Sequence, residues 1–290
     1  MASARDLKNK IRSISNTRKI THTMELVATS KAQRAQNRVR ATTPYSEKLR
    51  ELLMNLSATG TVEHPLLSAP KGDKRTAALV VTGNRGLCGG YNSVILQMAE
   101  KFIHSEKSKG REVDLYMVGI KGLSRLKYLK LKEKKSYTHF DDRPMFKDAS
   151  DIGGELISRF LKGELDQVVV FSTRFISAGN QVPEQVQILP IVPPAAEESE
   201  KKASTGDFIF EPDPQTMLEE ILPLSVKNII YRLLVESAAS EQLARRMAMK
   251  RATDNAEEMV ESYTRQYNRS RQAGITQQIN EIVSGASALE

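Results

Sequence analysis

The chain has 290 residues, with 43 Lys and Arg against 35 Asp and Glu, one cysteine and no tryptophan. A single cysteine excludes an internal disulfide, and no apolar run approaches the ~18 residues that a membrane-spanning helix needs. The start of the chain also lacks the apolar core of a signal peptide. The length predicts one or two domains.

Residues 3–57 predict one very long helix. Alternating steps of four and three residues from Leu7 trace a stripe that is apolar at both ends and small or polar in the middle. Such a stripe is typical of a left-handed coiled coil, and ~55 helical residues span ~80 Å. Pro44 is expected to kink or interrupt the helix. The expected seam includes Ile11, Ile14, Ala28 and Ala32.

The middle of the chain predicts a compact α/β domain over 75–213, preceded by a linker over 59–74. Short β-branched runs predict strands, and the runs between them have helical spacing. Strand–helix–strand order favours a mostly parallel, Rossmann-like sheet with helices on its faces. The expected strands are 76–82, 113–118, 167–173 and an edge strand at 185–191; the expected helices are 92–105, 121–131 and 149–160; a polar loop is expected over 193–206.

Residues 214–286 predict a second very long helix. Its seam contains an alanine stripe with four-residue spacing, and such small residues let two helix backbones approach closely. The stripe is Ala244, Ala248, Ala252 and Ala256, followed by Met259, Tyr263 and Tyr267, and then by Ile275, Ile279 and Val283. Pro223 is expected to break or bend this helix.

Neither terminal helix can fold alone into a globule, and their lengths of ~80 Å and ~105 Å exceed the width of any domain that the residues between them could form. We therefore expect residues 1–58 and 214–290 to pair as an antiparallel coiled-coil shaft that projects from the α/β domain. The alternative is that both are core helices of an ordinary bundle.

The positive charge is concentrated at one end of the chain. Residues 1–58 carry a net charge of +8, whereas residues 215–290 carry −1. A basic helix face indicates nucleic acid, an anionic membrane or an acidic protein surface as partner, or only a solvated face.

The best candidate for a reactive site is the glycine-rich segment 83–90, which contains Cys88. It lies between a predicted strand and a predicted helix, where phosphate-binding loops occur. It lacks the Gly-Lys-Ser/Thr ending of a nucleotide loop, so a tight turn is the favoured interpretation. The four histidines are scattered, no metal-ligand spacing is present, and no catalytic residue, metal site or cofactor is predicted.

Several segments together resemble the gamma subunit of the F-type rotary ATP synthase. They are ITHTMELVATSK at 20–31, RGLCGGYN at 85–92, AMKRATDN at 248–255 and RQAGITQ at 271–277. The resemblance covers essentially the whole chain. The plant-type regulatory insert with its cysteine pair is absent, which indicates the bacterial type.

The resemblance implies a non-catalytic rotor that transmits torque between the membrane c-ring and a catalytic ring of three alpha and three beta subunits. It also implies contact with the epsilon subunit, no nucleic-acid partner, and a peripheral place on the cytoplasmic face of the bacterial inner membrane. By the same resemblance, Met24, Arg271, Gln272 and Thr276 would contact the beta ring.

Two other classes remain open on the residues alone. One is a coiled-coil adaptor or nucleic-acid-associated rod that uses the basic first helix, whose affinity would fall steeply with salt. The other is a small α/β enzyme that uses Cys88 and would show a thiol-sensitive activity.

Overall fold

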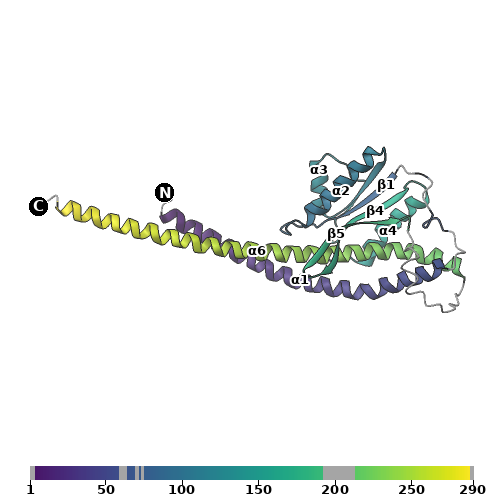
Figure 1. The fold of residues 1–290 in the computed structure, drawn as a ribbon, viewed down its shortest axis with the longest axis horizontal. Coiled ribbons are helices and arrows are strands. Elements are labelled where there is room, and N and C mark those ends of the chain that lie inside the picture. The colour runs from purple at the N-terminus through teal and green to yellow at the C-terminus, as the bar shows by residue number, and fades with distance from the viewer. Residues whose placement is uncertain (1–3, 59–63, 69–71, 73–74, 192–212, 288–290) are drawn as a thin grey trace. The chain divides into compact units, whose positions relative to one another are not determined.

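The computed structural model describes residues 4–58, 64–68, 72, 75–191 and 213–287. The chain divides into two compact units, one formed by 1–29 with 245–290 and the other by 30–244. Two long helices, α1 (Ala4–Ala58) and α6 (Pro214–Ser287), contribute residues to both units (Figure 1). We call the first the helical unit and the second the sheet unit.

The helical unit consists of two antiparallel helix segments. Thr21 Oγ1 accepts a hydrogen bond from Thr253 Oγ1 at 2.9 Å, and Arg18 forms a 2.8 Å ion pair with Glu257. The Lys10 ammonium lies 5.6 Å from the centre of the Tyr263 ring. Residues nearer the N-terminus of α1 therefore contact residues nearer the C-terminus of α6. This is the predicted antiparallel order.

The sheet unit contains five strands in the order β3-β2-β1-β4-β5. The first four strands of this order are mutually parallel, and β5 pairs antiparallel with β4 at the edge. The predicted mostly parallel α/β fold with long terminal helices is confirmed. The strands are β1 Arg75–Val81, β2 Glu112–Val118, β3 Lys135–Tyr137, β4 Gln167–Ser177 and β5 Asn180–Leu189.

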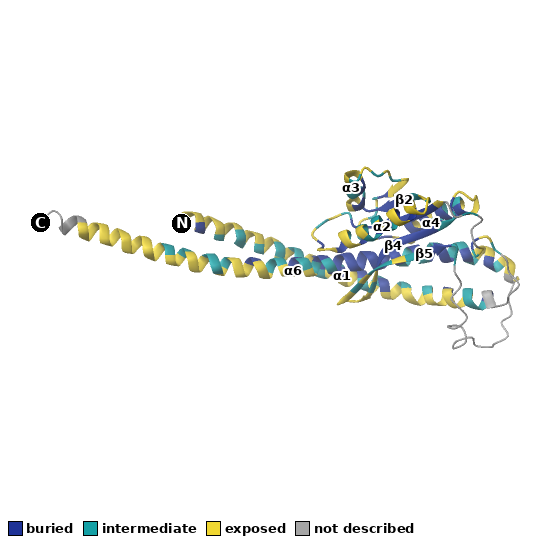
Figure 2. Ribbon diagram, turned by 45° about the horizontal axis from the view of Figure 1, so that its top comes forward, coloured by how far each residue is buried: buried dark blue, intermediate teal, exposed yellow. Residues whose placement is uncertain are grey.

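Helices cover both faces of this sheet (Figures 1 and 2). One face packs on α2 (Tyr91–Ser108) and α3 (Ile120–Tyr128). The other packs on α4 (Phe146–Leu161) and on the first part of α6. Successive β1 residues point to opposite layers: Leu79 joins the α4–α6 layer and Val80 the α2–α3 layer. Both faces of the sheet are therefore buried, as expected of parallel strands.

The sheet unit includes residues 30–58 of α1 and 214–244 of α6. Leu218, Val226 and Ile230 of α6 belong to the core that contains Leu79 and Ile152. The structural division at 29/30 and 244/245 thus differs from the expected one, which assigned 1–58 and 214–290 to a shaft and 75–213 to a domain. The difference arises because the apolar start of α6 packs against the sheet as well as against α1.

Two details differ from the sequence-based expectations. Both long helices continue through their prolines, Pro44 and Pro223, without a break. Val39 and Leu49 are buried on either side of Pro44, and this packing outweighs the lost backbone hydrogen bond. Strand β3 was not predicted, because its sequence Lys-Ser-Tyr has no apolar run. The expected loop 193–206 lies outside the described residues.

Candidate coupling surfaces

The glycine-rich segment 83–90 forms a closed turn rather than a reactive site. Gly83 N–H donates to Asn92 Oδ1 at 2.9 Å, and the Asn92 amide donates to Cys88 Sγ at 3.2 Å. Cys88 is 2% exposed, so solvent and substrates do not reach its thiol. This geometry favours the structural interpretation of the motif, in which its glycines allow a tight passage from β1 into α2.

Asn84 ties three segments together at the carboxyl end of the sheet. Its amide donates to Asp141 Oδ1 at 2.9 Å and to the Thr138 carbonyl at 3.3 Å. Its Oδ1 accepts the backbone N–H of Ile120, the first residue of α3, at 3.0 Å. The ends of β1 and β3 and the start of α3 are therefore held in one fixed arrangement.

Asp142 connects this end of the sheet to both long helices within the sheet unit. Its carboxylate pairs with Lys31 of α1 at 2.8 Å and accepts a hydrogen bond from Gln242 of α6 at 3.4 Å. Burial opposes ionisation of Asp142, but the hydrogen bond and charge of Lys31 outweigh burial and lower its pKa. Asp142 is therefore a junction between the sheet and both long helices. No local pattern indicates this, because Lys31 is 111 residues away.

Some basic residues of α1 form ion pairs with other parts of the chain. Arg18 pairs with Glu257 in the helical unit, and Lys31 pairs with Asp142 in the sheet unit. Part of the positive excess of the first 58 residues therefore serves contacts within the chain. These pairs were not foreseen from the sequence.

The α1 side of the predicted seam is buried or half-buried along its whole length. Ala28 and Ala32 are buried, and Ile11 and Ile14 are half-buried. On α6, Ala256 is buried, whereas Ala244, Ala248 and Ala252 are half-buried.

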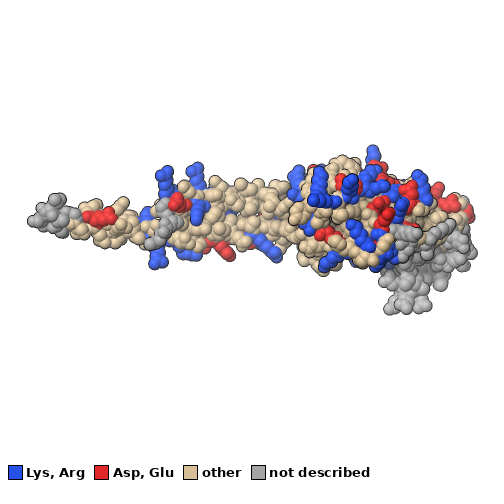
Figure 3. Space-filling model, turned by 90° about the horizontal axis from the view of Figure 1, so that it is seen from above, with Lys and Arg blue, Asp and Glu red and all other residues tan. Residues whose placement is uncertain are grey.

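The last turns of α6 have a different environment from the seam. Every residue from 271 to 284 is exposed, although the periodic stripe continues through Ile275, Ile279 and Val283. We call residues 271–284 the tail. Its charged side chains are sparse and consist of Arg271 and Glu281 (Figure 3).

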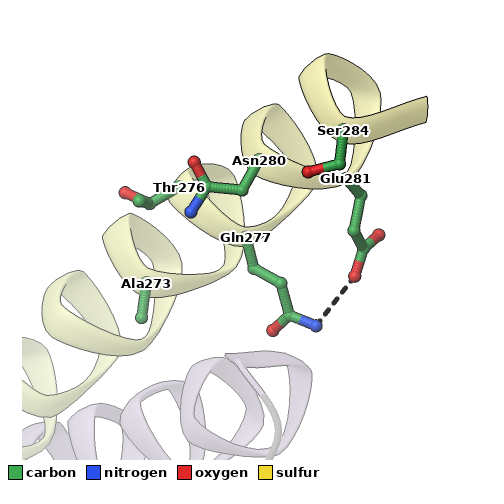
Figure 4. Close-up of a pocket in the computed structure, with 6 residues that line it drawn as sticks. All are labelled: Ala273, Thr276, Gln277, Asn280, Glu281 and Ser284. Carbon is green, nitrogen blue, oxygen red and sulfur yellow. Dashed lines mark hydrogen bonds between the residues drawn. The ribbon is translucent and has the colours of Figure 1, made fainter. Parts of the chain in front are cut away.

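The tail has a shallow hollow along one side of the helix (Figure 4). All of its lining residues come from α6 itself, and Gln277 donates to Glu281 at 2.9 Å within it. The hollow therefore presents a helix face rather than an enclosed ligand site. Its lining residues are Ala273, Thr276, Gln277, Asn280, Glu281 and Ser284.

The four expected partner contacts lie on both long helices. Arg271, Gln272 and Thr276 are exposed on the tail, whereas Met24 is half-buried on α1. Thr276 Oγ1 donates to the Gln272 carbonyl at 3.0 Å, so its hydroxyl is turned back along the helix.

Within the described part of the chain, no group of three or more His, Cys, Asp and Glu residues is arranged to hold a metal ion. No described helix has the length and apolar character needed to cross a membrane.

Comparison with known proteins identifies the family. The family described as ATP synthase matches residues 3–289. The ATP synthase gamma chain of Leptospira biflexa is 45% identical, and that of Gemmatimonas aurantiaca is 42% identical, each over 100% of both chains. Among solved structures, a chain of the Euglena gracilis mitochondrial ATP synthase aligns with a TM-score of 0.68 at 16% identity. That alignment covers 99% of this chain and 94% of the Euglena chain. These findings confirm the resemblance predicted from the motifs: the chain belongs to the family of ATP synthase gamma chains.

Proposed function

We propose that this chain transmits torque between a membrane-embedded c-ring and a catalytic ring of three alpha and three beta subunits. As a gamma chain it is a non-catalytic subunit of the central stalk. Rotation of its asymmetric surface would drive each beta subunit in turn through open and closed states. Contact with the epsilon subunit belongs to the same proposal.

The main support for this proposal is the exposure of apolar side chains on the tail. Four branched apolar side chains, Ile275, Ile279, Ile282 and Val283, are between 48% and 72% exposed on it. An exposed apolar stripe of this kind favours a site that contacts another protein. The cavity of the alpha–beta ring would surround the tail, with Arg271, Gln272 and Thr276 among the contacts. Met24 on α1 would provide a further contact.

The sheet unit supports the other half of the proposal, the input of torque. The Asp142 junction and the α6 core fasten the sheet to both long helices, so a force on the sheet loads the helices directly. Each helix runs through its internal proline without a break and continues into the helical unit. A turning force therefore has a covalent, helical path toward the tail.

The location of the protein is part of the same proposal. A gamma chain is a peripheral part of a membrane-bound complex. We place this one on the cytoplasmic face of a bacterial inner membrane, because similar curated gamma chains come from bacteria such as Leptospira and Gemmatimonas.

The decisive experiment removes the tail. A chain that ends at Ser270 loses ~25 Å of helix α6 and should still assemble with alpha and beta subunits. In membrane vesicles, ATP hydrolysis should persist, whereas ATP-driven proton pumping and ATP synthesis should fall strongly. A chain that ends at Gly285 is the matched control and should behave as the wild type.

Single substitutions refine the same experiment. Arg271→Ala, Gln272→Ala and Thr276→Ala should each reduce coupling less than the truncation does, because the contact is distributed along the helix. Full coupling by the chain that ends at Ser270 would contradict the proposal.

The competing enzyme hypothesis makes a distinct prediction. It requires ATP hydrolysis by the isolated chain that disappears on Cys88→Ser, whereas the rotor proposal expects no hydrolysis by the isolated chain. The burial of Cys88 and its hydrogen bond from Asn92 favour the rotor.

A further inference from the structure

The sheet unit contains a cavity of about 600 Å³ between α1, α6 and the β4–β5 hairpin. Its volume lies within the range of ~300–1,000 Å³ that is usual for small-molecule sites. The coupling function described above does not use it.

The cavity is lined mainly by apolar side chains at one end. Leu49 and Leu222 are buried there, and Leu53 and Ile229 are half-buried. The antiparallel pairing of α1 and α6 is fixed nearby by the Asn228–Ser46 hydrogen bond of 3.0 Å. This register sets Leu49 and Leu53 beside the early turns of α6, away from Glu236.

The other end of the cavity is polar. Arg232 and Glu236 of α6 line it together with Arg174 of β4. Glu236 is 7% exposed, and its Oε2 accepts the Phe175 backbone N–H at 3.1 Å. Arg232 Nε lies 3.8 Å from Glu236 Oε1, which is a loose pair.

Positive charge exceeds negative charge in the lining of the cavity, which contains Arg50, Arg174 and Arg232 against Glu47 and Glu236. Among the described residues, no ion pair or hydrogen bond occupies the guanidinium of Arg174. Burial, together with the nearby charge of Glu184, raises the pKa of Glu236; the charges of Arg232 and Arg174 and the hydrogen bond from Phe175 only partly offset that effect. At this end of the lining, Glu236 provides one carboxyl group against the two guanidinium groups of Arg174 and Arg232.

We propose that this cavity binds an amphipathic monoanion, a medium-chain carboxylate whose head group lies between Arg174 and Arg232. Its hydrocarbon chain extends along Leu49, Leu53 and Leu222. The two cations select the carboxylate by charge-assisted hydrogen bonds, and the apolar end removes the chain from water. A cationic amphiphile of equal length is repelled by the same arginines.

Isothermal titration calorimetry tests this proposal with decanoate, below the concentration at which it forms micelles. The titration uses the full chain, alone and assembled with its alpha, beta and epsilon subunits. We expect saturable binding in both preparations and binding of decanol that is at least tenfold weaker, because decanol lacks the charge that the arginines recognise.

Two variants locate the ligand. Arg174→Gln with Arg232→Gln should weaken decanoate binding about tenfold or more while leaving decanol binding unchanged. Lys101→Gln with Lys127→Gln is the matched control, because it removes the same charge from exposed positions on α2 and α3. Leu53→Trp fills the apolar end and should abolish the binding of both probes.

Four results would overturn the proposal. They are the absence of saturable decanoate binding up to about 1 mM, equal affinity for decanol, and wild-type affinity in the double arginine variant. The fourth is binding to the isolated chain that is lost in the assembled complex, which would identify the cavity as a docking surface for another subunit.

Discussion

Residues 222–243 and residues 271–284 belong to the same uninterrupted helix, α6, but their side chains have opposite environments. Val226, Ile230 and Leu234 in the first region are at most 2% exposed, because they pack into the core of the sheet unit. Ile275 and Ile279 in the tail are 48% and 54% exposed. Both regions have branched apolar residues at helical spacing, so the spacing does not distinguish them.

The apolar side chains of these two regions of α6 therefore have different roles. In the first region apolar side chains stabilise the fold, because burial removes them from water. In the tail the same residue types contribute little to the stability of the isolated chain and are available to a partner. Substitutions in the first region should therefore change unfolding, and substitutions in the tail should change coupling.

The largest expected contrast comes from one substitution made at two positions. Ile230→Ala should lower the free energy of unfolding by about 2–5 kcal/mol, because it leaves a cavity in a close-packed core. Ile279→Ala should change it by less than ~0.5 kcal/mol, because the side chain is half-exposed. Urea unfolding of the full chain measures both. Equal losses at the two positions would refute the division.

The same substitution at two alanines, one in the seam and one on the tail, tests how closely the helices pack. Ala256 is 5% exposed between the helices of the helical unit, so Ala256→Leu should overpack it at a cost of about 1–3 kcal/mol. Ala273→Leu, on the tail, should be nearly neutral. Thermal unfolding followed by circular dichroism compares the two, and a neutral Ala256→Leu would mean that the helices are not closely packed there.

The Asp142 junction predicts a pH-dependent effect. Asp142→Asn should cost about 1 kcal/mol or less at pH 7, because the ion pair with Lys31 is partly exposed. The pKa of folded Asp142 lies below its ordinary value of 3.8. The stabilisation is therefore complete above about pH 4 and is lost as the pH falls through the folded pKa.

Unfolding measured between pH 7 and pH 3 checks this sign. The wild type and Asp142→Asn should converge at the acid end, whereas Asp254→Asn, at an exposed position on α6, should match the wild type throughout. A difference between wild type and Asp142→Asn that grows toward low pH would contradict the assignment.

The smallest expected effect is local to the tail. Gly274 has no neighbouring atom within 4 Å of an added Cβ, so Gly274→Ala should raise local helix stability by up to ~1 kcal/mol. Amide hydrogen exchange in the tail should slow, while the urea midpoint of the chain stays unchanged. Faster exchange would show that the glycine is needed there for its backbone conformation.

The sequence by itself determined the elements and the family. Helical periodicity and β-branched runs are local patterns, so they located α1, α6 and four of the five strands. The three-residue strand β3 could not be predicted from the sequence, because a strand this short and polar depends on its pairing with β2 rather than on its own residues. The motifs at 20–31, 85–92, 248–255 and 271–277 indicate the gamma-chain family on their own, because they depend on residue identity and order rather than on contacts.

The tertiary structure decided which parts of these elements have partners. Stripes on both helices indicated pairing, but only the fold showed that α6 is buried against the sheet near its start and exposed over residues 271–284. It also brought Lys31 to Asp142 and Asn228 to Ser46, and it kept both helices continuous through their prolines. Hydrophobic periodicity identifies which face of a helix is apolar. Whether that face is covered depends on residues that are far away in the chain.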